Sequence, residues 1–435
     1  MNRPCLCGRF FSFRGRMAED KSLKYMLLTL ALALTCTLVG SVRLSGADGG
    51  EGRKACGRVL RVALVGDPQV DDSTEMGYAR RSVYRELYGR RDLDMCIFLG
   101  DLVNDNMTLL PESVRVIDSL PYPCFMVPGN HDRDVRGDRP MPFVRNLMTW
   151  RKVVGYVDTS FVRSNVRFIL MNNVRHSDSG MTDYVGGFTG TQKHWLDSVL
   201  NVGAPALTVL ATHIPFSQMK GRDSVLALVP EATRVLYVSG HTHYVSRDDS
   251  VPELIAGATC GSWWRGVKDT DGIPYALQSC GSPRGYFIAD FHRGGRYDLT
   301  YKCVGRPASE QLSAWAIPVG SDTCSYRLYV NVFGGSTDGI VRVRVPRRGR
   351  GVCGKSYLCE RSNATAPEVE KVIRFNASLS REYRRTHRTE FIPLRRKPSP
   401  HLWKTTATFS GHGPAYVNVI YRDAHMRIKQ RVKVQ

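Results

Sequence analysis

The sequence lacks several features that would place it in a simple structural class. It has no collagen-like or low-complexity bias, and no segment repeats at a fixed period, which excludes fibrous and repeat architectures. Its longest apolar run, residues 25–40, is shorter than the roughly 20 residues that a membrane-spanning helix needs. None of its 12 cysteines has the CxxC…CxxC spacing of a zinc site, so no metal is assigned to cysteine. A composition of 42% hydrophobic and 23% charged residues is that of a globular protein, and 435 residues are too many for one ordinary core.

Acidic residues are scarce relative to basic ones, above all near the C-terminus. From Arg306 to Gln435 there are 24 Lys and Arg residues against 9 Asp and Glu residues, a net charge of +15 out of +21 for the whole chain. Such an excess favours a polyanionic partner, namely an anionic glycan or a lipid headgroup, and no specific nucleic acid partner is predicted. The alternative is a basic face that is simply solvated.

The N-terminal segment has the composition of a targeting sequence. Basic residues precede the apolar run "YMLLTLALALTCTLVG", and small residues follow it. We therefore predict that residues 1–47 form a signal peptide or an N-terminal membrane anchor. The protein is then exported: periplasmic, secreted, or membrane-anchored and facing outside the cytoplasm.

An exported protein folds in an oxidising compartment, where disulfides form. Nine cysteines follow residue 47, an odd number that cannot pair completely within one chain. Cys96 and Cys124 lie inside apolar runs, which predicts buried thiols. Cys353 and Cys359 are close enough in the sequence to close a small loop.

Two patterns divide the rest of the chain. Over residues 58–306, short apolar runs ending in polar loops alternate with helical patterns such as "YARRSVYRELYGR" and "TGTQKHWLDSVL", which predicts an α/β fold. Over residues 307–435, segments such as "SYRLYVNVF" and "AYVNVIY" alternate polar and apolar residues, with no long helical stretch. This period of two predicts a small, basic, antiparallel β-domain.

The polar loops of the first region carry an ordered set of metal-ligand types. Ligands in α/β folds gather at the carboxyl ends of strands, where each of these loops is expected to lie. Each loop alone is a weak signal, but the ordered set is rarely produced by chance. In chain order the residues are Asp67, Gln69, Asp101, Asn130, His131, Asp132, His213, His241 and His243.

The residue types suit a centre of two divalent cations. Such a pair can clamp a phosphoryl group and activate the attacking water between the ions. A carboxylate with two acceptor oxygens can bridge them, and Asp101 is the candidate. His241 and His243, two residues apart, can face different metals, and Asn130 offers an uncharged oxygen. His131 can remain free of metal and act as a proton donor.

This ordered set strongly resembles the calcineurin-like metallophosphoesterase superfamily. The family pattern D-x-H, GD, GNH[D/E], H, GHxH appears here as "GDPQ", "GDLVND", "GNHD", "THIPF" and "GHTH", over about residues 60–245. The segments "GATCGSWWRGVKDTDGIP", "GSPRGYFIADF" and "SPHLWK" resemble the C-terminal region of exported bacterial members. The resemblance implies a four-layer α/β/β/α core, here followed by the C-terminal β-domain.

The resemblance also implies roles for the individual residues. One metal ion would be held by Asp67, Gln69, Asp101 and His243, and the other by Asp101, Asn130, His213 and His241. His131 would be the general acid that protonates the leaving oxygen, with Asp132 orienting it. The two ions would be Mn, Fe or Zn. The implied activity is hydrolysis of a phosphate ester, by a phosphomonoesterase or a phosphodiesterase.

Two local features leave alternatives open. Gln69 stands where the family usually has histidine; an amide oxygen is a harder donor that favours Mn²⁺ or Fe over Zn²⁺. Trp263 and Trp264 either stack against a substrate or pack in the core. The missing histidine and the basic tail also support a competing hypothesis, an exported polyanion-binding protein with a vestigial metallophosphoesterase core.

Overall fold

The computed structural model describes residues 59–135, 146–176, 183–320, 325–346, 354–408 and 416–435. The predicted targeting segment, residues 1–47, lies outside these ranges. Within them, no helix combines the length and the apolar character needed to cross a membrane.

The first sheet of the core has five strands in the order β13-β12-β1-β2-β3. The central strand β1 pairs in parallel with β2 on one side and antiparallel with β12 on the other. Strand β2 in turn pairs in parallel with β3. The chain therefore returns from residue 285 onward to complete the sheet that it began at residue 60. The bounds are β1 Leu60–Val65, β2 Met95–Phe98, β3 Cys124–Met126, β12 Gly285–Phe291 and β13 Tyr297–Cys303.

The second sheet has six strands in the order β10-β11-β9-β8-β5-β4. Its four inner strands are parallel to their neighbours, and the two edge strands are antiparallel. The bounds are β4 Thr159–Arg163, β5 Val166–Leu170, β8 Leu207–Ala211, β9 Val235–Ser239, β10 Val245–Asp248 and β11 Glu253–Ala256. A small antiparallel pair, β6 Val174–His176 and β7 Tyr184–Gly186, lies outside this sheet.

The two sheets pack face to face, with helices covering their outer faces. Successive side chains of a strand point to opposite faces, so Val62 and Leu64 of β1 join the core between the sheets, whereas Ala63 and Val65 face the helices. These helices are α2 Ser73–Ala79, the π-helical turn η1 Arg80–Tyr84, α3 Arg85–Gly89, the 3₁₀ turn η2 Met107–Leu109, α4 Leu110–Asp118 and α5 Met148–Val154.

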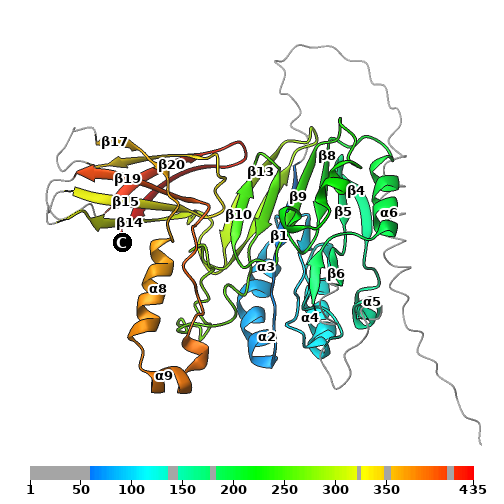
Figure 1. Ribbon diagram of the computed structural model, residues 1–435, viewed down its shortest axis with the longest axis horizontal. Helices are drawn as coiled ribbons and strands as arrows, with labels where there is room; N and C mark the ends of the chain where they lie inside the picture. Colours follow the sequence, from blue (N-terminus) through cyan, green and yellow to red (C-terminus); the bar gives the residue numbers. More distant parts are fainter. Residues whose placement is uncertain (1–58, 136–145, 177–182, 321–324, 347–353, 409–415) are drawn as a thin grey trace, which may run out of the picture. The chain divides into compact units, whose positions relative to one another are not determined.

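The outer face of the second sheet is covered in the same way. It packs on α6 Gly190–Leu200, the 3₁₀ turn η4 Phe216–Gln218 and α7 Arg222–Leu226. Thr189 and Gln192 form a reciprocal capping box at the N-terminus of helix α6. The result is the predicted four-layer α/β/β/α arrangement, with the helices outside the sheets (Figure 1).

The C-terminal region contains the predicted antiparallel β-domain, built as two four-stranded sheets. Their orders are β14-β15-β19-β18 and β17-β16-β20-β21. Buried side chains such as Val330 and Val343 lie between them and continue the hydrophobic core of the α/β layers. The strands are β14 Leu312–Pro318, β15 Ser325–Val332, β16 Ile340–Val345, β17 Lys355–Leu358, β18 Glu360–Arg361, β19 Leu402–Thr408, β20 Tyr416–Arg422 and β21 Arg427–Lys433.

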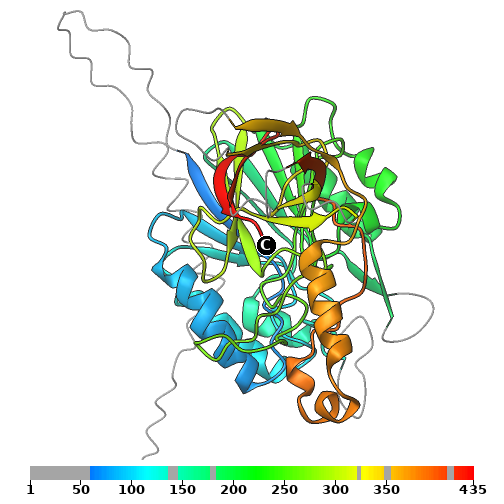
Figure 2. The ribbon, with the colours of Figure 1, turned by 90° about the vertical axis from the view of Figure 1, so that its left-hand side faces the viewer.

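The expectation of no long helical stretch in this region is wrong. Between β18 and β19 the chain forms α8 Pro367–Ser378, α9 Arg381–Thr386 and the 3₁₀ turn η5 Arg388–Glu390 (orange in Figure 2). Proline in the first turn, followed by acidic residues, suits a helix N-terminus. The apolar residues Val369, Val372 and Ile373 then recur at helical spacing, and they join the small cluster that packs α8 on Leu277.

All cysteines that the structure describes are free and buried. Cys96 and Cys124 are in-register neighbours on β2 and β3, which confirms the prediction of buried thiols. The suggested partner of Cys359 is Cys353, which lies outside the described residues. That disulfide stays a prediction.

Candidate metal centre

The structure brings all the predicted ligand residues to one edge of the two sheets. Each follows the carboxyl end of a strand: Asp67 and Gln69 after β1, Asp101 after β2, Asn130 after β3, His213 after β8, and His241 and His243 after β9. A cavity of about 360 Å³ opens there and is lined by Gln69, Asp101, Asn130, His131, His241 and His243. Asp67 and His213 are fully buried next to it.

The backbone of these loops is held in an uncommon conformation. Asp67, Gln69, Asp101, His241 and His243 all have φ between 40° and 71°, in the left-handed region that non-glycine residues rarely adopt. Such conformations cost of order 1–3 kcal/mol each and persist where the surrounding structure imposes them, often at functional sites. The conformation turns several side chains toward a common centre.

The glycines of the GN and GH motifs allow the loops to approach one another. A Cβ atom on Gly129 would lie 2.0 Å from the Asp101 carboxylate, and one on Gly240 would lie 2.3 Å from the Asp67 carboxylate. Neither distance can accommodate a carbon atom. The motif glycines are therefore needed for the two carboxylates to sit beside the neighbouring loops.

The first cluster of donors consists of Asp101, Asn130, His213 and His241. Nε2 of His213 lies 2.9 Å from Oδ1 of Asn130, 3.2 Å from Oδ2 of Asp101 and 3.1 Å from Nδ1 of His241. The other ring nitrogen, Nδ1, lies 2.8 Å from the carbonyl oxygen of Leu99 and must donate to it, because a carbonyl only accepts. Nε2 of His213 then faces three atoms with lone pairs, on Asn130, Asp101 and His241.

This arrangement fits a cation. A proton on one of these nitrogens or a metal ion between the four atoms would satisfy the lone pairs that converge here. The ligand atoms of Asp101, His213 and His241 all lie within 4.8 Å of one another, close enough to bind a single ion. Oxygen and imidazole nitrogen are common ligands of divalent transition metals.

The second cluster is looser. Nε2 of His243 lies 3.8 Å from the Asp67 carboxylate, and its Nδ1 donates to the carbonyl oxygen of Gly261 at 2.6 Å. The backbone N–H of His241 donates to both oxygens of Asp67 at 3.0 Å. The side chain of Gln69 also lines the cavity, and its amide lies 3.4 Å from Oδ1 of Asn104.

The electrostatics hold His241 and His243 neutral but favour the protonated form of His213 beside the buried carboxylates. Burial lowers the pKa of His241 to about 3 and that of His243 to about 4, so both rings offer lone pairs at pH 7. Burial also lowers the pKa of His213, but the charge of Asp101 and its hydrogen bond outweigh burial and raise it to about 9. Burial raises the pKa of Asp101, yet His213 holds it below its usual range.

His131 lies beside this centre and is oriented by a different carboxylate from the predicted one. Its Nδ1 pairs with Asp105 at 2.8 Å. Burial lowers the pKa of His131, but the hydrogen bond to Asp105 and the charge of Asp101 outweigh burial and raise it. The predicted partner, Asp132, is fully buried and accepts hydrogen bonds from the backbone N–H groups of Gly129 and Val103, so its role is to fix the loop.

The two neighbouring tryptophans have different positions. Trp264 is buried, and its indole N–H donates to the carbonyl oxygen of Pro68 at 2.9 Å. Trp263 instead lines the cavity, with its ring centroid 6.2 Å from that of His131 and 5.4 Å from that of His243. Of the two open interpretations, core packing holds for Trp264, and a position beside the site holds for Trp263.

Sequence reasoning missed several residues at this site. Besides Asp105, they include Tyr184 of strand β7, and Arg395 and Lys397 from the C-terminal region. No local pattern identifies the last three, because each reaches the cavity from an element that is distant in the sequence from the ligand loops. Asp105 lies in the "GDLVND" loop, but only the fold shows that its carboxylate meets the ring of His131.

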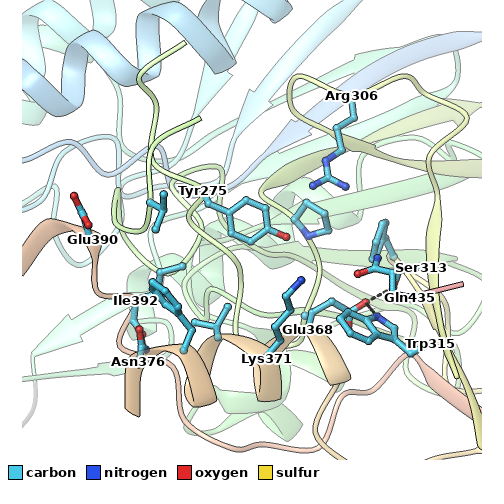
Figure 3. A pocket seen from close by; sticks show the side chains of 16 residues that line it. Tyr275, Arg306, Ser313, Trp315, Glu368, Lys371, Asn376, Glu390, Ile392 and Gln435 are labelled. Atoms are coloured by element: carbon cyan, nitrogen blue, oxygen red, sulfur yellow. Dashed lines mark hydrogen bonds between the residues drawn. The ribbon is translucent and has the colours of Figure 1, made fainter. Parts of the chain in front are cut away.

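A second cavity, of about 450 Å³, lies against the inner side of α8 (Figure 3). Arg306, Lys371, Tyr275 and Trp315 line it. Glu368 at its edge accepts hydrogen bonds from Ser313 and from the indole N–H of Trp315, the latter at 2.9 Å. This cavity is separate from the ligand set described above.

Comparisons of the sequence with family models indicate one class, the metallophosphoesterases. Residues 60–245 match the family model described as "Calcineurin-like phosphoesterase", and residues 253–425 match the model described as "C terminal of Calcineurin-like phosphoesterase". The chain belongs to the calcineurin-like phosphoesterase family. Family membership implies divalent metal ions and a phosphate-ester substrate.

The other comparisons add little. A purple acid phosphatase isolated from yellow lupin (Lupinus luteus) seeds is structurally similar, with a TM-score of 0.38 and 13% sequence identity. The match covers 58% of this chain and 52% of that phosphatase, about half its length. No curated protein matches the sequence.

Proposed function

We propose that the protein is a metal-dependent hydrolase of phosphate esters, acting on a monoester or a diester. The observation that carries this proposal is the convergence of Asp101, Asn130, His213 and His241 on one point, in a chain of the calcineurin-like family. Apart from Gln69, every expected ligand is present, which favours this function over the alternative of a polyanion-binding protein with a vestigial core.

The residues divide into two ligand sets that share Asp101. Asp101, Asn130, His213 and His241 would hold one divalent ion, and Asp67, Gln69, Asp101 and His243 would hold a second. The ions would be Mn, Fe or Zn. When bound, they would supply the positive charge that polarises the phosphoryl oxygens and lowers the pKa of the attacking water.

The remaining groups of the cavity would handle the leaving group. His131 lies on the cavity wall, and Asp105 fixes its ring through Nδ1. Nε2 is then the atom available to give a proton to the departing oxygen. Such a transfer contributes on the order of 10²–10⁴-fold to the rate of comparable enzymes.

The predicted location supports an extracytoplasmic substrate. We propose that residues 1–47 direct export, on the grounds of their basic and apolar composition. The protein would then act on phosphate esters outside the cytoplasm.

Asp101→Asn tests the function. Because Asp101 belongs to both ligand sets, the variant should lose phosphate release and most bound metal together. Asp290→Asn, which changes a partly exposed carboxylate paired with Arg61, is the control and should retain both. The measurements are phosphate release with Mn²⁺, Zn²⁺ or a chelator, and metal content by mass spectrometry. Full activity of Asp101→Asn would contradict the proposal.

A further inference from the structure

Part of the C-terminal region forms one wall of the candidate metal centre. Pro393, Arg395 and Lys397 line the same cavity as Asp101 and His241. They belong to the stretch "PLRRKPSPH", residues 393–401, which connects the helices α8 and α9 to strand β19. The sequence shows only that this stretch is basic and loop-like.

The three consecutive basic residues of this stretch point in different directions. Arg395 and Lys397 face the cavity. Arg396, between them, pairs with Glu370 of α8 through two contacts of 2.8 and 3.1 Å. This alternation is that of an extended chain, whose successive side chains point to opposite sides.

The stretch is anchored on both sides of the basic residues. Before them, the N–H of Gly266 donates to the carbonyl oxygen of Thr389 at 2.8 Å, and Ile392 is buried in the cluster under α8. After them, the hydroxyl of Tyr244 donates to the carbonyl oxygen of Pro398 at 2.6 Å, and Ser399 is buried. The fold therefore holds the basic side chains of Arg395 and Lys397 at the cavity.

The side chains of Arg395 and Lys397 are exposed and available for a ligand. Among the described residues, no ion pair involves Arg395 or Lys397, in contrast to Arg396. An arginine offers a planar fork that suits phosphate or carboxylate, and a lysine offers a compact charge. Two such groups facing a metal centre can hold an anionic group that the metal ions do not reach.

We propose that Arg395 and Lys397 form an anion subsite that selects phosphate esters carrying a second anionic group, either a carboxylate or another phosphate. The inference rests on the proposed function, because it assigns the substrate class of that same site. The scissile phosphate lies at the metal ligands, and the second anion lies on the C-terminal wall. The C-terminal region thereby takes part in choosing the substrate.

The experiment compares pairs of substrates that differ in the second anion. Glycerol 3-phosphate and 3-phosphoglycerate differ by a carboxylate, and fructose 6-phosphate and fructose 1,6-bisphosphate differ by a phosphate. For the Arg395→Gln/Lys397→Gln variant, we expect KM to rise roughly 10–100-fold for the doubly anionic member that the subsite recognises. For the members without the second anionic group, we expect KM to change by less than about twofold. We expect kcat to be unchanged for every substrate.

Arg396→Gln is the matched control, because it removes the same charge from the same stretch but on the opposite side. It should leave every KM near the wild-type value. Binding of propylphosphonate and 3-phosphonopropionate, measured by calorimetry on the Mn²⁺-loaded protein, gives a readout that needs no turnover. The wild type should bind the second compound more tightly, and the double variant should lose that preference.

The outcomes separate the two proposals. The subsite is refuted, and the proposed function stands, if phosphate is released but the double variant changes KM equally for both members of each substrate pair. The same holds if Arg396→Gln changes KM in the same way as the double variant. If no ester is hydrolysed with any metal, yet the preference for 3-phosphonopropionate exists and is lost in the double variant, the proposed function is refuted and the subsite stands.

Discussion

A buried ion pair between the α/β core and the C-terminal β-domain gives a stability prediction that can be worked out from the structure. Arg247 of β10 contacts Asp423, in the turn between β20 and β21, at 2.8 Å, and their side chains are 2% and 1% exposed. Asp423 also accepts hydrogen bonds from the hydroxyl of Tyr421 and from the backbone N–H of His425.

Asp423→Ala should destabilise the protein by about 3–5 kcal/mol. Removing one member of a buried pair leaves the other charge poorly compensated, and that cost is of this order. Arg247 retains only the carbonyl oxygen of Gly334 at 3.2 Å and Asp249 at 3.4 Å, both long contacts. Because total stabilities are about 5–15 kcal/mol, the loss would be a large part of the whole.

Urea unfolding monitored by tryptophan fluorescence measures the effect. We expect a lower midpoint with an unchanged dependence on urea concentration. The control is Glu382→Ala, which breaks the pair with Arg385 whose side chains are 71% and 74% exposed; it should cost less than about 1 kcal/mol. Arg247→Met/Asp423→Leu should recover much of the loss, since apolar replacement of both partners is often neutral. The reasoning is refuted if Asp423→Ala costs no more than Glu382→Ala.

Three further predictions concern the site and the effect of pH. Gln69→His should tighten metal binding and shift the preference toward Zn²⁺ in a metal titration; an unchanged preference would show that residue 69 does not coordinate. His131→Ala should lower kcat on the order of 10²–10⁴-fold with near-normal metal content, and Asp105→Asn should lower it less; loss of metal from the first variant would make His131 a ligand. Burial, with a smaller contribution from Arg361, lowers the pKa of His401 from 6.5 to about 3. Between about pH 3 and 6.5, His401 is therefore protonated in the unfolded state but neutral in the folded state. Stability from this group is therefore lost as pH falls below about 6.5, by roughly 2 kcal/mol at pH 5, and His401→Gln should show a correspondingly weaker pH dependence in urea unfolding.

The pattern of residues alone predicted the α/β fold and the place of the ligand set, and the family resemblance predicted the four layers. Short buried runs such as residues 60–65 form strands because their alternate side chains are buried on both faces. In a parallel arrangement, the polar loops that follow such strands must meet at one edge. The order of Asp67, Asp101, His213 and His241 along the chain was therefore enough to predict that they lie together.

In the C-terminal region, the sequence pattern predicted the strands but not the helices. Its strands follow from a period of two, but α8 interrupts that pattern with a single apolar stripe that includes Val369 and Val372. The stripe is short, and it is stabilised by packing on Leu277, which lies about ninety residues earlier in the sequence. A local pattern cannot report a contact of this kind.

Only the tertiary structure decided which groups surround the predicted ligands. Asp132 adjoins His131 in the sequence, but its carboxylate accepts hydrogen bonds from backbone N–H groups, and Asp105 takes its place beside the ring. Arg395 and Arg396 are indistinguishable in the sequence, yet one faces the metal centre and the other faces α8. The direction of a side chain is set by anchoring contacts far along the chain, and these exist only once the chain has folded.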